Sequence, residues 1–244
     1  NDEVRMEYAG ILFKARQVDK ASQEYTTLLK KHPDRPELIR SLVDTLLATG
    51  DLSRAGDVLT DALKKFPDRL DFAIDLARIE ALDNNFKGAT AIVDEHIKGR
   101  EIPRGRLQLD ALELFIQLRR PELAEPLLTQ LEKASPDSAK ILAAGVRYAL
   151  LVGDRKTAEE KADRLDRLYP RDVDLRAELA SSLYAADAFK SSRRIFESIL
   201  KVAPENIIAK LGLARINFRN YQMDKALELL NSVPEKSRDR QWQL

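Results

Sequence analysis

Residues 36–67 read PELIRSLVDTLLATGDLSRAGDVLTDALKKFP. Apolar side chains recur every three or four residues on both sides of Thr49-Gly50-Asp51, a spacing that is typical of amphipathic helices and not of strands. Gly50 suits the left-handed end of the first helix, and Asp51 suits the N-cap of the second. Pro67 prevents the second helix from continuing. The stretch therefore predicts a helical hairpin.

The hairpin recurs along the whole chain with a period of 34 residues. A small residue marks the same position in every copy, with a single interval of 35: Ala21, Ala55, Ala89, Ala124, Ala158, Ser192 and Ala226. A larger apolar residue follows four positions later in most copies, and a proline closes most of them. A fixed period of this length indicates a stack of helix–turn–helix units, each of which packs only on its neighbours.

We expect these units to form a single solenoid over residues 1–244. The expected bounds of the units are 2–35, 36–69, 70–104, 105–138, 139–172, 173–206 and 207–236. Two glycines and a proline within residues 98–105 predict a looser joint in the third unit. Residues 237–244 are interpreted as the start of a further unit or a terminal helix. In the first case Trp242 is expected to be exposed, and the natural protein to extend beyond Leu244.

This pattern resembles the tetratricopeptide repeat family, whose signature combines a small residue, a large apolar residue four positions later and a closing proline. The resemblance implies an all-α fold, a right-handed α-solenoid of helix–turn–helix repeats. It also implies that the first helix of each unit lines a concave surface that receives ligands. The expected function is therefore that of a protein–protein interaction scaffold.

The composition argues against several other classes of protein. The chain has 41 basic and 40 acidic residues, so it lacks the basic excess that nucleic-acid binding needs. No apolar run approaches the roughly 18 residues of a membrane-spanning helix. There is no cysteine, and neither His32 nor His96 has a second histidine at the spacing of a helical metal site. We therefore expect no enzymatic activity, cofactor, metal ion, nucleic-acid partner or membrane contact in this segment.

Charges on the first helices change sign along the chain. The residues that the resemblance places on the concave surface are, in chain order, Glu37, Asp44, Asp71, Asp75, Arg78, Arg106, Lys140, Arg147, Arg215 and Arg219. We expect the acidic and the basic half of this groove to orient a protein partner, with Arg147 and Arg215 facing solvent. The alternative is an ordinary solvated surface that carries both signs without a binding role.

Three functions are compatible with these features. The array resembles the periplasmic repeat segment of bacterial exopolysaccharide exporters of the Pel type, which implies a fragment of a longer array that recruits a polysaccharide-modifying enzyme during biofilm formation. Direct binding of a polysaccharide along the groove is the second possibility, with Phe13, Tyr184 and Phe218 as the aromatic platforms. The third is a cytoplasmic adaptor or regulator that binds a peptide.

Overall fold

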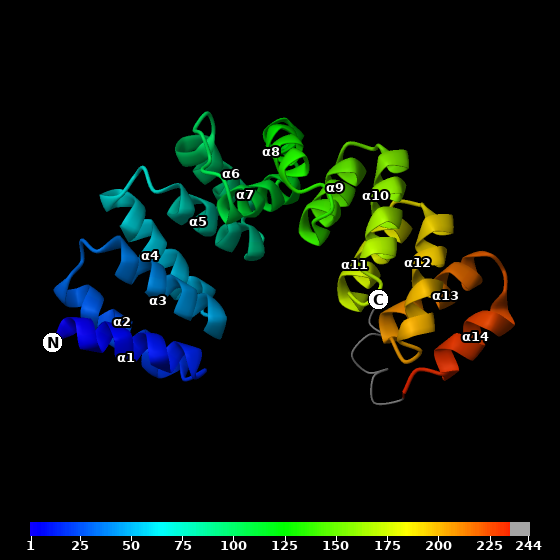
Figure 1. The fold of residues 1–244 in the computed structure, drawn as a ribbon, viewed down its shortest axis with the longest axis horizontal. Coiled ribbons are helices and arrows are strands. Elements are labelled where there is room, and N and C mark those ends of the chain that lie inside the picture. The colour runs from blue at the N-terminus through cyan, green and yellow to red at the C-terminus, as the bar shows by residue number, and fades with distance from the viewer. Residues whose placement is uncertain (235–244) are drawn as a thin grey trace. The chain divides into compact units, whose positions relative to one another are not determined.

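The computed structural model describes residues 1–234, which form fourteen α-helices and one short π-helix without any strand (Figure 1). The all-helical fold predicted from the sequence is confirmed. The helices form two compact units that divide between Leu118 and Arg119. This division falls inside the expected repeat 105–138, and a single solenoid over the whole chain stays a prediction. The expectations for Trp242 concern residues outside the described part of the chain.

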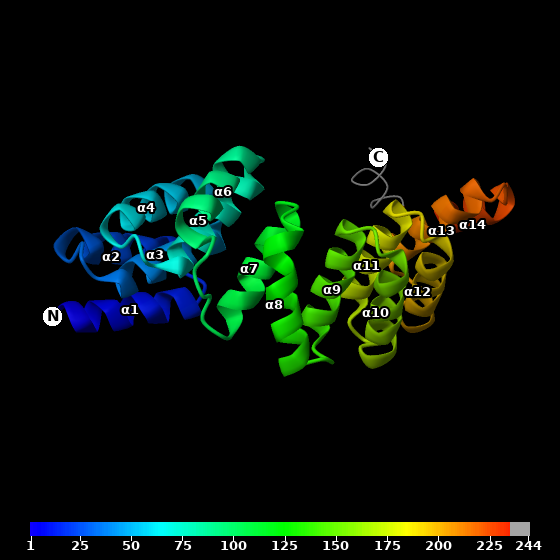
Figure 2. The ribbon, with the colours of Figure 1, turned by 90° about the horizontal axis from the view of Figure 1, so that it is seen from above.

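The first unit spans Asn1–Leu118. Its helices are α1 (Asp2–Lys14), α2 (Val18–Lys31), α3 (Pro36–Thr49), α4 (Leu52–Lys65), α5 (Leu70–Leu82), α6 (Phe86–Ile92), the π-helix η1 (Val93–Ile97) and α7 (Arg106–Gln117). From α1 to α6 each helix packs against the next one along the chain, and α7 packs on α5 (Figure 2). The core of this unit is therefore a continuous row of contacts between successive helices.

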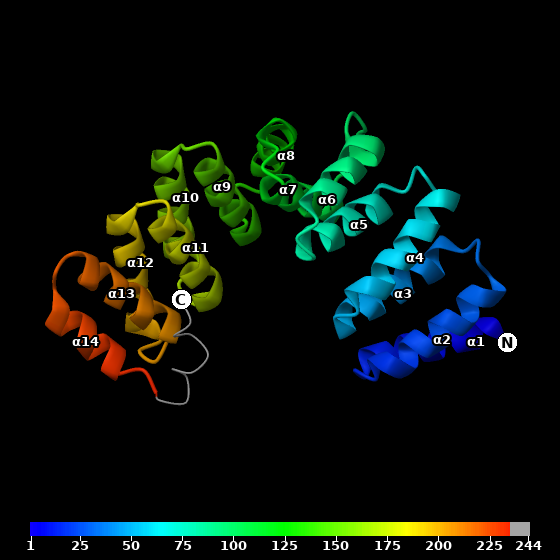
Figure 3. The same cartoon turned by 180° about the vertical axis from the view of Figure 1, so that it is seen from behind.

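The second unit spans Arg119–Leu244, of which residues 119–234 are described. Its helices are α8 (Pro121–Ala134), α9 (Ala139–Leu151), α10 (Arg155–Leu168), α11 (Val173–Ala185), α12 (Phe189–Val202), α13 (Ile207–Arg219) and α14 (Met223–Asn231). Successive helices pack on one another from α8 to α14, and α11 also packs on both α9 and α13 (Figure 3). The first helices of the pairs therefore form their own layer within this unit.

Within each unit, the small repeat residues lie on helices that pack against the first helix of their pair, as α2 packs on α1 and α10 on α9. The small residue of α8, whose first helix belongs to the other unit, is likewise buried. Ala21, Ala55, Ala89, Ala124, Ala158 and Ser192 are completely buried, and Ala226 is 4% exposed. The hydroxyl of Ser192 donates a hydrogen bond of 2.7 Å to the carbonyl of Ala180 on the facing helix. A buried serine is tolerated at this contact because its polar atom has a backbone partner.

Each helical pair turns through one residue with a left-handed backbone. These residues share one repeat position: Arg16, Gly50, Asn84, Arg119, Gly153, Asp187 and Tyr221. At the second turn the Gly50 N–H donates to the Leu47 carbonyl at 3.1 Å, and the Asp51 N–H to the Leu46 carbonyl at 3.0 Å. This is the Schellman arrangement, which satisfies the last carbonyls of a helix. Glycine occupies only two of the seven turns, so five side chains hold a conformation that costs L-residues free energy.

The third helical pair ends differently from the others. The Lys98 N–H donates to the Val93 carbonyl at 2.8 Å, a π-type bond, and eight residues, 98–105, then lead to α7. The side chain of Ile102 is buried, and Arg100 forms an ion pair of 3.3 Å with Asp68. The segment that the sequence marks as a looser joint is therefore long, but it is anchored by two of its own side chains.

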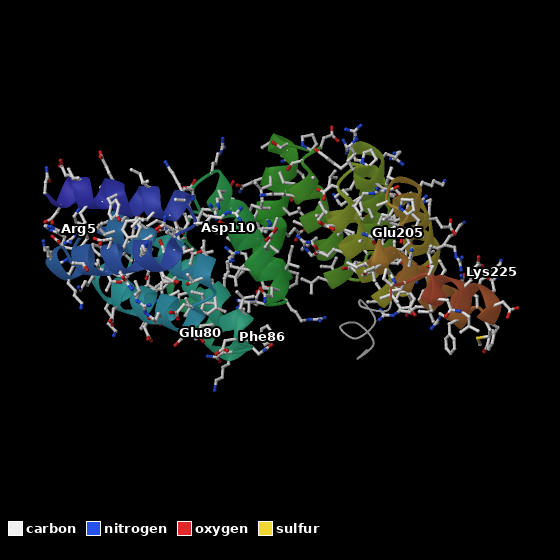
Figure 4. The ribbon with its side chains drawn as sticks, turned by 90° about the horizontal axis from the view of Figure 1, so that it is seen from below. Arg5, Glu80, Phe86, Asp110, Glu205 and Lys225 are labelled. Atoms are coloured by element: carbon white, nitrogen blue, oxygen red, sulfur yellow. The ribbon has the colours of Figure 1, made fainter. Side chains whose placement is uncertain are left out.

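Two buried cations occupy the same repeat position in the second unit. Arg176 on α11 is 2% exposed and donates from Nε to Asp166 at 2.7 Å. It also bonds the Ser198 hydroxyl on α12 and the carbonyl of Pro170. Lys210 on α13 donates to Glu205 (labelled in Figure 4) at 2.9 Å. Each buried charge is thus paired, as it must be to offset the loss of hydration.

Enlarging the small repeat residue should destabilise the fold. We expect Ala55→Leu and Ala158→Leu each to lower the free energy of unfolding by about 1–3 kcal/mol, because both residues are completely buried between helices. Ala48→Leu, on the exposed side of α3, is the matched control and should have little effect. Urea denaturation followed by circular dichroism measures the difference. Equal midpoints for all three variants would contradict the packing described here.

Replacing a left-handed side chain with glycine should stabilise the fold. Tyr221 has φ 58° and its side chain is 87% exposed, so Tyr221→Gly removes backbone strain and little packing. We expect a gain of about 1 kcal/mol, with a loss of similar size for Gly153→Ala at the same position of another turn. Thermal denaturation of both variants tests this, and a destabilised Tyr221→Gly would show that the tyrosine ring makes a contact of its own.

Candidate partner-binding groove

The last helical pair of the second unit carries an open apolar groove. Its volume is about 750 Å³, and it runs between α13 and α14 with Tyr184 of α11 also in its wall. The apolar side chains that line it are Leu211, Ala214, Phe218, Met223, Ala226, Leu227 and Leu230. Phe218 is 64% exposed and Leu227 56% exposed. Large apolar side chains gathered at one open surface are typical of a site that another molecule covers.

Two arginines complete the wall of this groove. Arg215 and Arg219 are one helical turn apart on α13, and both are exposed. The Arg219 guanidinium lies 4.2 Å from the centre of the Phe189 ring, a cation–π contact that positions its charge beside the groove. The groove therefore combines an apolar floor with two positive charges, the combination that suits an amphipathic segment with acidic side chains.

The repeat itself explains why this surface is apolar. In the preceding pair, α11–α12, the equivalent surface is covered by α13. Phe196 of α12 is 1% exposed, and its ring fills the space beside Gly212 of α13, where a Cβ atom would lie only 2.2 Å from it. Leu230 occupies the position of Phe196 one repeat later, and no described helix covers it. The groove is thus the packing face of a helical pair that has no described neighbour.

The predicted acidic residues of the first unit are largely neutralised by arginines. The Arg40 guanidinium contacts Asp75 directly and lies 3.6 Å from Asp44 and 3.8 Å from Asp71. Asp75 is 8% exposed. The expected acidic half of a groove is therefore, in this unit, a set of ion pairs within α3 and between α3 and α5. The predicted residue Glu37 is exposed.

Asp71 shows how strongly these charges interact. Burial acts to raise the pKa of the Asp71 carboxyl, but the hydrogen bonds from Arg69, at 2.8 Å, and the charges of Arg69 and Arg40 outweigh burial. The pKa of Asp71 consequently lies below its ordinary value. The same pair raises the pKa of Arg69 through its hydrogen bonds with the carboxylate. The negative charge of the Asp71 carboxylate is therefore paired with Arg69 within the chain.

Ion pairs also join successive first helices at fixed repeat positions. Arg78 on α5 lies 3.7 Å from Asp110 on α7 (labelled in Figure 4), and Arg147 on α9 lies 2.8 Å from Glu178 on α11. The two arginines are equivalent residues of the repeat, and so are the two acids. The expectation that Arg147 faces solvent is wrong in part, because its side chain is 27% exposed and is held by Glu178.

The remaining predicted residues are accounted for as follows. Arg106, Lys140 and Arg215 are exposed, as was expected of Arg215. The Arg106 Nε atom lies 3.4 Å from the Asp110 carboxylate. Of the three proposed aromatic platforms, Tyr184 and Phe218 both line the groove, while Phe13 belongs to the first unit. The role of the ten predicted groove residues in binding stays a prediction.

Sequence reasoning missed the contribution of α14 to this site. The predicted groove residues all come from first helices, whereas half of the apolar wall comes from α14. A signal was present in the sequence, because Met223 and Leu227 lie on the face of α14 next to the small repeat residue Ala226. Among residues 1–234 there is no group of acidic or histidine side chains that could hold a metal ion, and none of these helices is both long and apolar enough to cross a membrane.

Within each unit the helical pairs stack on their neighbours, and the α13–α14 pair presents an open groove. This arrangement defines a helical-repeat scaffold. Sequence models of the tetratricopeptide repeat match residues 183–244 in one case and residues 9–60 and 40–103 in another. The chain belongs to the tetratricopeptide repeat family. The resemblance found in the repeat pattern is thereby confirmed at the level of the family, whose members typically act as protein-interaction scaffolds and not as enzymes.

Solved structures with the same fold are distant in sequence. A tetratricopeptide repeat protein from Parabacteroides merdae ATCC 43184 is 16% identical, with a TM-score of 0.68 over 97% of this chain and 94% of that one. PilW, a type IV pilus biogenesis factor, is 15% identical, with a TM-score of 0.66 over 87% and 98%. PilF from Pseudomonas aeruginosa is 18% identical, with a TM-score of 0.54 over 87% and 90%. No curated protein matches the chain in sequence.

Proposed function

We propose that this tetratricopeptide repeat scaffold binds a protein partner through the α13–α14 groove, and that the bound segment is an amphipathic helix with acidic side chains. The observation that carries the proposal is the exposed apolar wall of Phe218, Met223 and Leu227 beside Arg215 and Arg219. A helix in a groove buries its apolar face against such a wall, and its acidic residues meet the two guanidinium groups.

The energetic terms favour a reversible complex. Each apolar side chain that becomes fully buried contributes about 1.5–3 kcal/mol, and association costs at least about 4 kcal/mol in lost freedom. An exposed ion pair adds only about 0.2–1 kcal/mol. The apolar anchors therefore determine affinity, and the arginines determine orientation and the rate of association.

A polysaccharide is the second candidate ligand, and Tyr184 with Phe218 is the observation that favours it. The Tyr184 ring meets the Phe189 ring edge-on, with centroids 5.3 Å apart and planes at 68°. Most of the remaining wall is aliphatic and offers few hydrogen-bonding groups to sugar hydroxyls. For this reason the helical segment is the better fit.

Binding of defined peptides tests the groove. We expect a labelled amphipathic helical peptide with two glutamates one turn apart to bind the chain, and its counterpart with two lysines to bind at least several-fold more weakly. Fluorescence anisotropy measures both affinities. Phe218→Ala/Leu227→Ala should abolish binding, because it removes two of the anchors.

The matched control for this experiment is Leu168→Ala/Val202→Ala. These side chains are 47% and 54% exposed at the ends of α10 and α12, away from the groove residues in sequence, so their loss should leave binding unchanged. Equal weakening by both double variants would contradict the proposal. Binding of soluble glucan or acetylglucosamine oligomers in place of the peptide would instead favour the polysaccharide.

For the biological setting we propose, from the resemblance in the repeat pattern, a periplasmic segment that recruits a polysaccharide-modifying enzyme to an exopolysaccharide exporter. A cytoplasmic adaptor that binds a signalling peptide is the alternative. We expect the tagged chain to recover such an enzyme from cell-envelope fractions, and Phe218→Ala/Leu227→Ala to recover much less of it. Recovery of partners from the cytosol alone, identified by mass spectrometry, would contradict the periplasmic setting.

A further inference from the structure

We propose that a polar pocket between α2 and α4 binds a primary ammonium group carried on a short carbon chain, as in a lysine side chain or a free diamine. The pocket belongs to the first unit, so it is a different site from the α13–α14 groove, and the inference does not rest on the proposed function. It follows from the lining of the pocket, from one buried hydroxyl without a partner, and from the cation that another helical pair carries at the equivalent place.

The pocket is formed by three successive helices. Helices α2 and α4 both pack on α3, and residues of all three line an open space of about 740 Å³. This volume is typical of small-molecule sites. Every lining residue is polar or charged except Leu46 of α3, which is 1% exposed. The pocket therefore suits a small ligand whose recognition depends on hydrogen bonds and charge.

The threonines of the lining offer hydrogen-bond acceptors to a ligand. Thr26, Thr27 and Thr49 each donate their hydroxyl hydrogen to a carbonyl of their own helix, at 2.7, 2.9 and 2.8 Å. A hydroxyl has one hydrogen and two lone pairs, so each of these oxygens is left as an acceptor. A ligand that pairs with them must supply N–H or O–H donors.

The charges of the lining favour a cation among such donors. The Asp51 carboxylate lies 3.4 Å from the Arg54 guanidinium, so these two charges offset each other. Asp19 is exposed and forms no ion pair with a described residue. One carboxylate of the pocket is therefore unmatched, and it repels anions and attracts cations. An ammonium group supplies the opposite charge together with three N–H donors.

Ser22 is the observation that points most directly to a ligand. It lines the pocket and is 5% exposed, and no residue among 1–234 forms a hydrogen bond with its hydroxyl oxygen. Buried polar groups are nearly always hydrogen-bonded, because an unpaired one has lost water without replacing it. The buried hydroxyl of Ser192, in contrast, donates to a carbonyl at 2.7 Å. An ammonium N–H that donates to the Ser22 oxygen supplies the missing partner.

Another helical pair carries a cation at the equivalent place. Arg193 of α12 holds the repeat position of Ser22. Its guanidinium donates to Asn217 of α13 at 2.8 Å and lies 3.7 Å from Glu197. Asn217 in turn holds the repeat position of Leu46. The second unit thus places a cation of its own between these helices, whereas the short side chain of Ser22 leaves the equivalent space of the first unit open to a ligand.

A carbon chain on the ammonium group fits the remaining contacts. The side chain of Leu46 and the methyl groups of the three threonines supply apolar atoms to the lining. Long cationic side chains lay their methylene groups along apolar surface and keep the charged end at polar groups. We therefore expect both a lysine side chain and a five-carbon diamine to bind, with an affinity that falls as salt rises.

Titration of the isotope-labelled chain with matched small compounds tests the proposal. We expect cadaverine and Nα-acetyl-lysine methylamide to shift the NMR signals of the Ser22, Thr49 and Arg54 backbone amides in a saturable way. Glutarate and pentanediol, which carry carboxylates and hydroxyls in place of ammonium groups, should shift them much less. Binding of cadaverine alone would assign the pocket to a free diamine, and binding of the lysine derivative alone would assign it to a protein partner.

Two substitutions test the roles of the named side chains. Asp19→Asn should weaken the binding of cadaverine by about two- to five-fold, because it removes one exposed charge. Ser22→Ala should weaken it by about tenfold or more, because it removes a buried hydrogen bond to a charged group. Ser192→Ala, which removes a buried hydroxyl of the second unit, is the matched control and should leave binding unchanged.

The unfolding temperatures of the same variants distinguish an unpartnered hydroxyl from a structural one. Without ligand, Ser22→Ala should unfold at or above the temperature of the wild-type chain, because no hydrogen bond within residues 1–234 is lost. Ser192→Ala should unfold at a lower temperature, because it loses its bond to Ala180. Cadaverine should raise the unfolding temperature of the wild-type chain by more than that of Ser22→Ala.

Four outcomes would overturn the proposal. If neither amine causes saturable shifts, the pocket is not an ammonium site. Equal binding of pentanediol or glutarate would show that the pocket does not select a cation. Cadaverine shifts that lie outside α2–α4, or that Ser22→Ala leaves unchanged, would place the bound cation elsewhere on the chain. A Ser22→Ala variant destabilised as much as Ser192→Ala would show that the Ser22 hydroxyl already has a partner within the protein.

Discussion

The close approach of two helices at one small residue is the constraint on which this structure depends. Ala55 and its equivalents are buried, so the two backbones of a pair approach too closely for a larger side chain. The next pair can then cover the resulting flat apolar face, as α13 covers Phe196. The stacking of successive pairs depends on this close approach, because each closely packed pair presents an apolar face on which the next first helix can pack.

The helices and their pairing could be predicted because they depend on periodic apolar residues. The turns are easily recognised at Gly50 and Gly153, and Asn84 and Asp187 are of residue types that tolerate a left-handed backbone. Arg16, Arg119 and Tyr221 give no sign in the sequence that they adopt it. The neighbouring helices impose that conformation and outweigh its cost of about 1–2 kcal/mol. Local propensity is therefore a poor guide where the packing on both sides of a residue is strong.

The candidate site was predicted less completely, for a reason that lies in electrostatics. The sign of each charge can be read from the sequence, but its partner cannot. Asp75 and Arg147 read as free surface charges, whereas Arg40 and Glu178 neutralise them. Arg176 reads in the same way and is buried. Arg215 and Arg219 are exposed. The apolar wall beside them also includes residues of α14, the second helix of its pair, whereas the predicted groove residues all lie on first helices.

The groove also lies on the helix of the second unit with the fewest buried residues. Of the nine residues of α14, only Ala226 is buried, whereas α13 has seven buried residues. Segments with little buried surface open with a small free energy, so the backbone amides of α14 should exchange with solvent deuterium earlier than those of α13. A ligand that binds only the closed form shifts this equilibrium by mass action. Occupation of the groove is thus coupled to local folding, and slower exchange in α14 would report binding without any label on the partner.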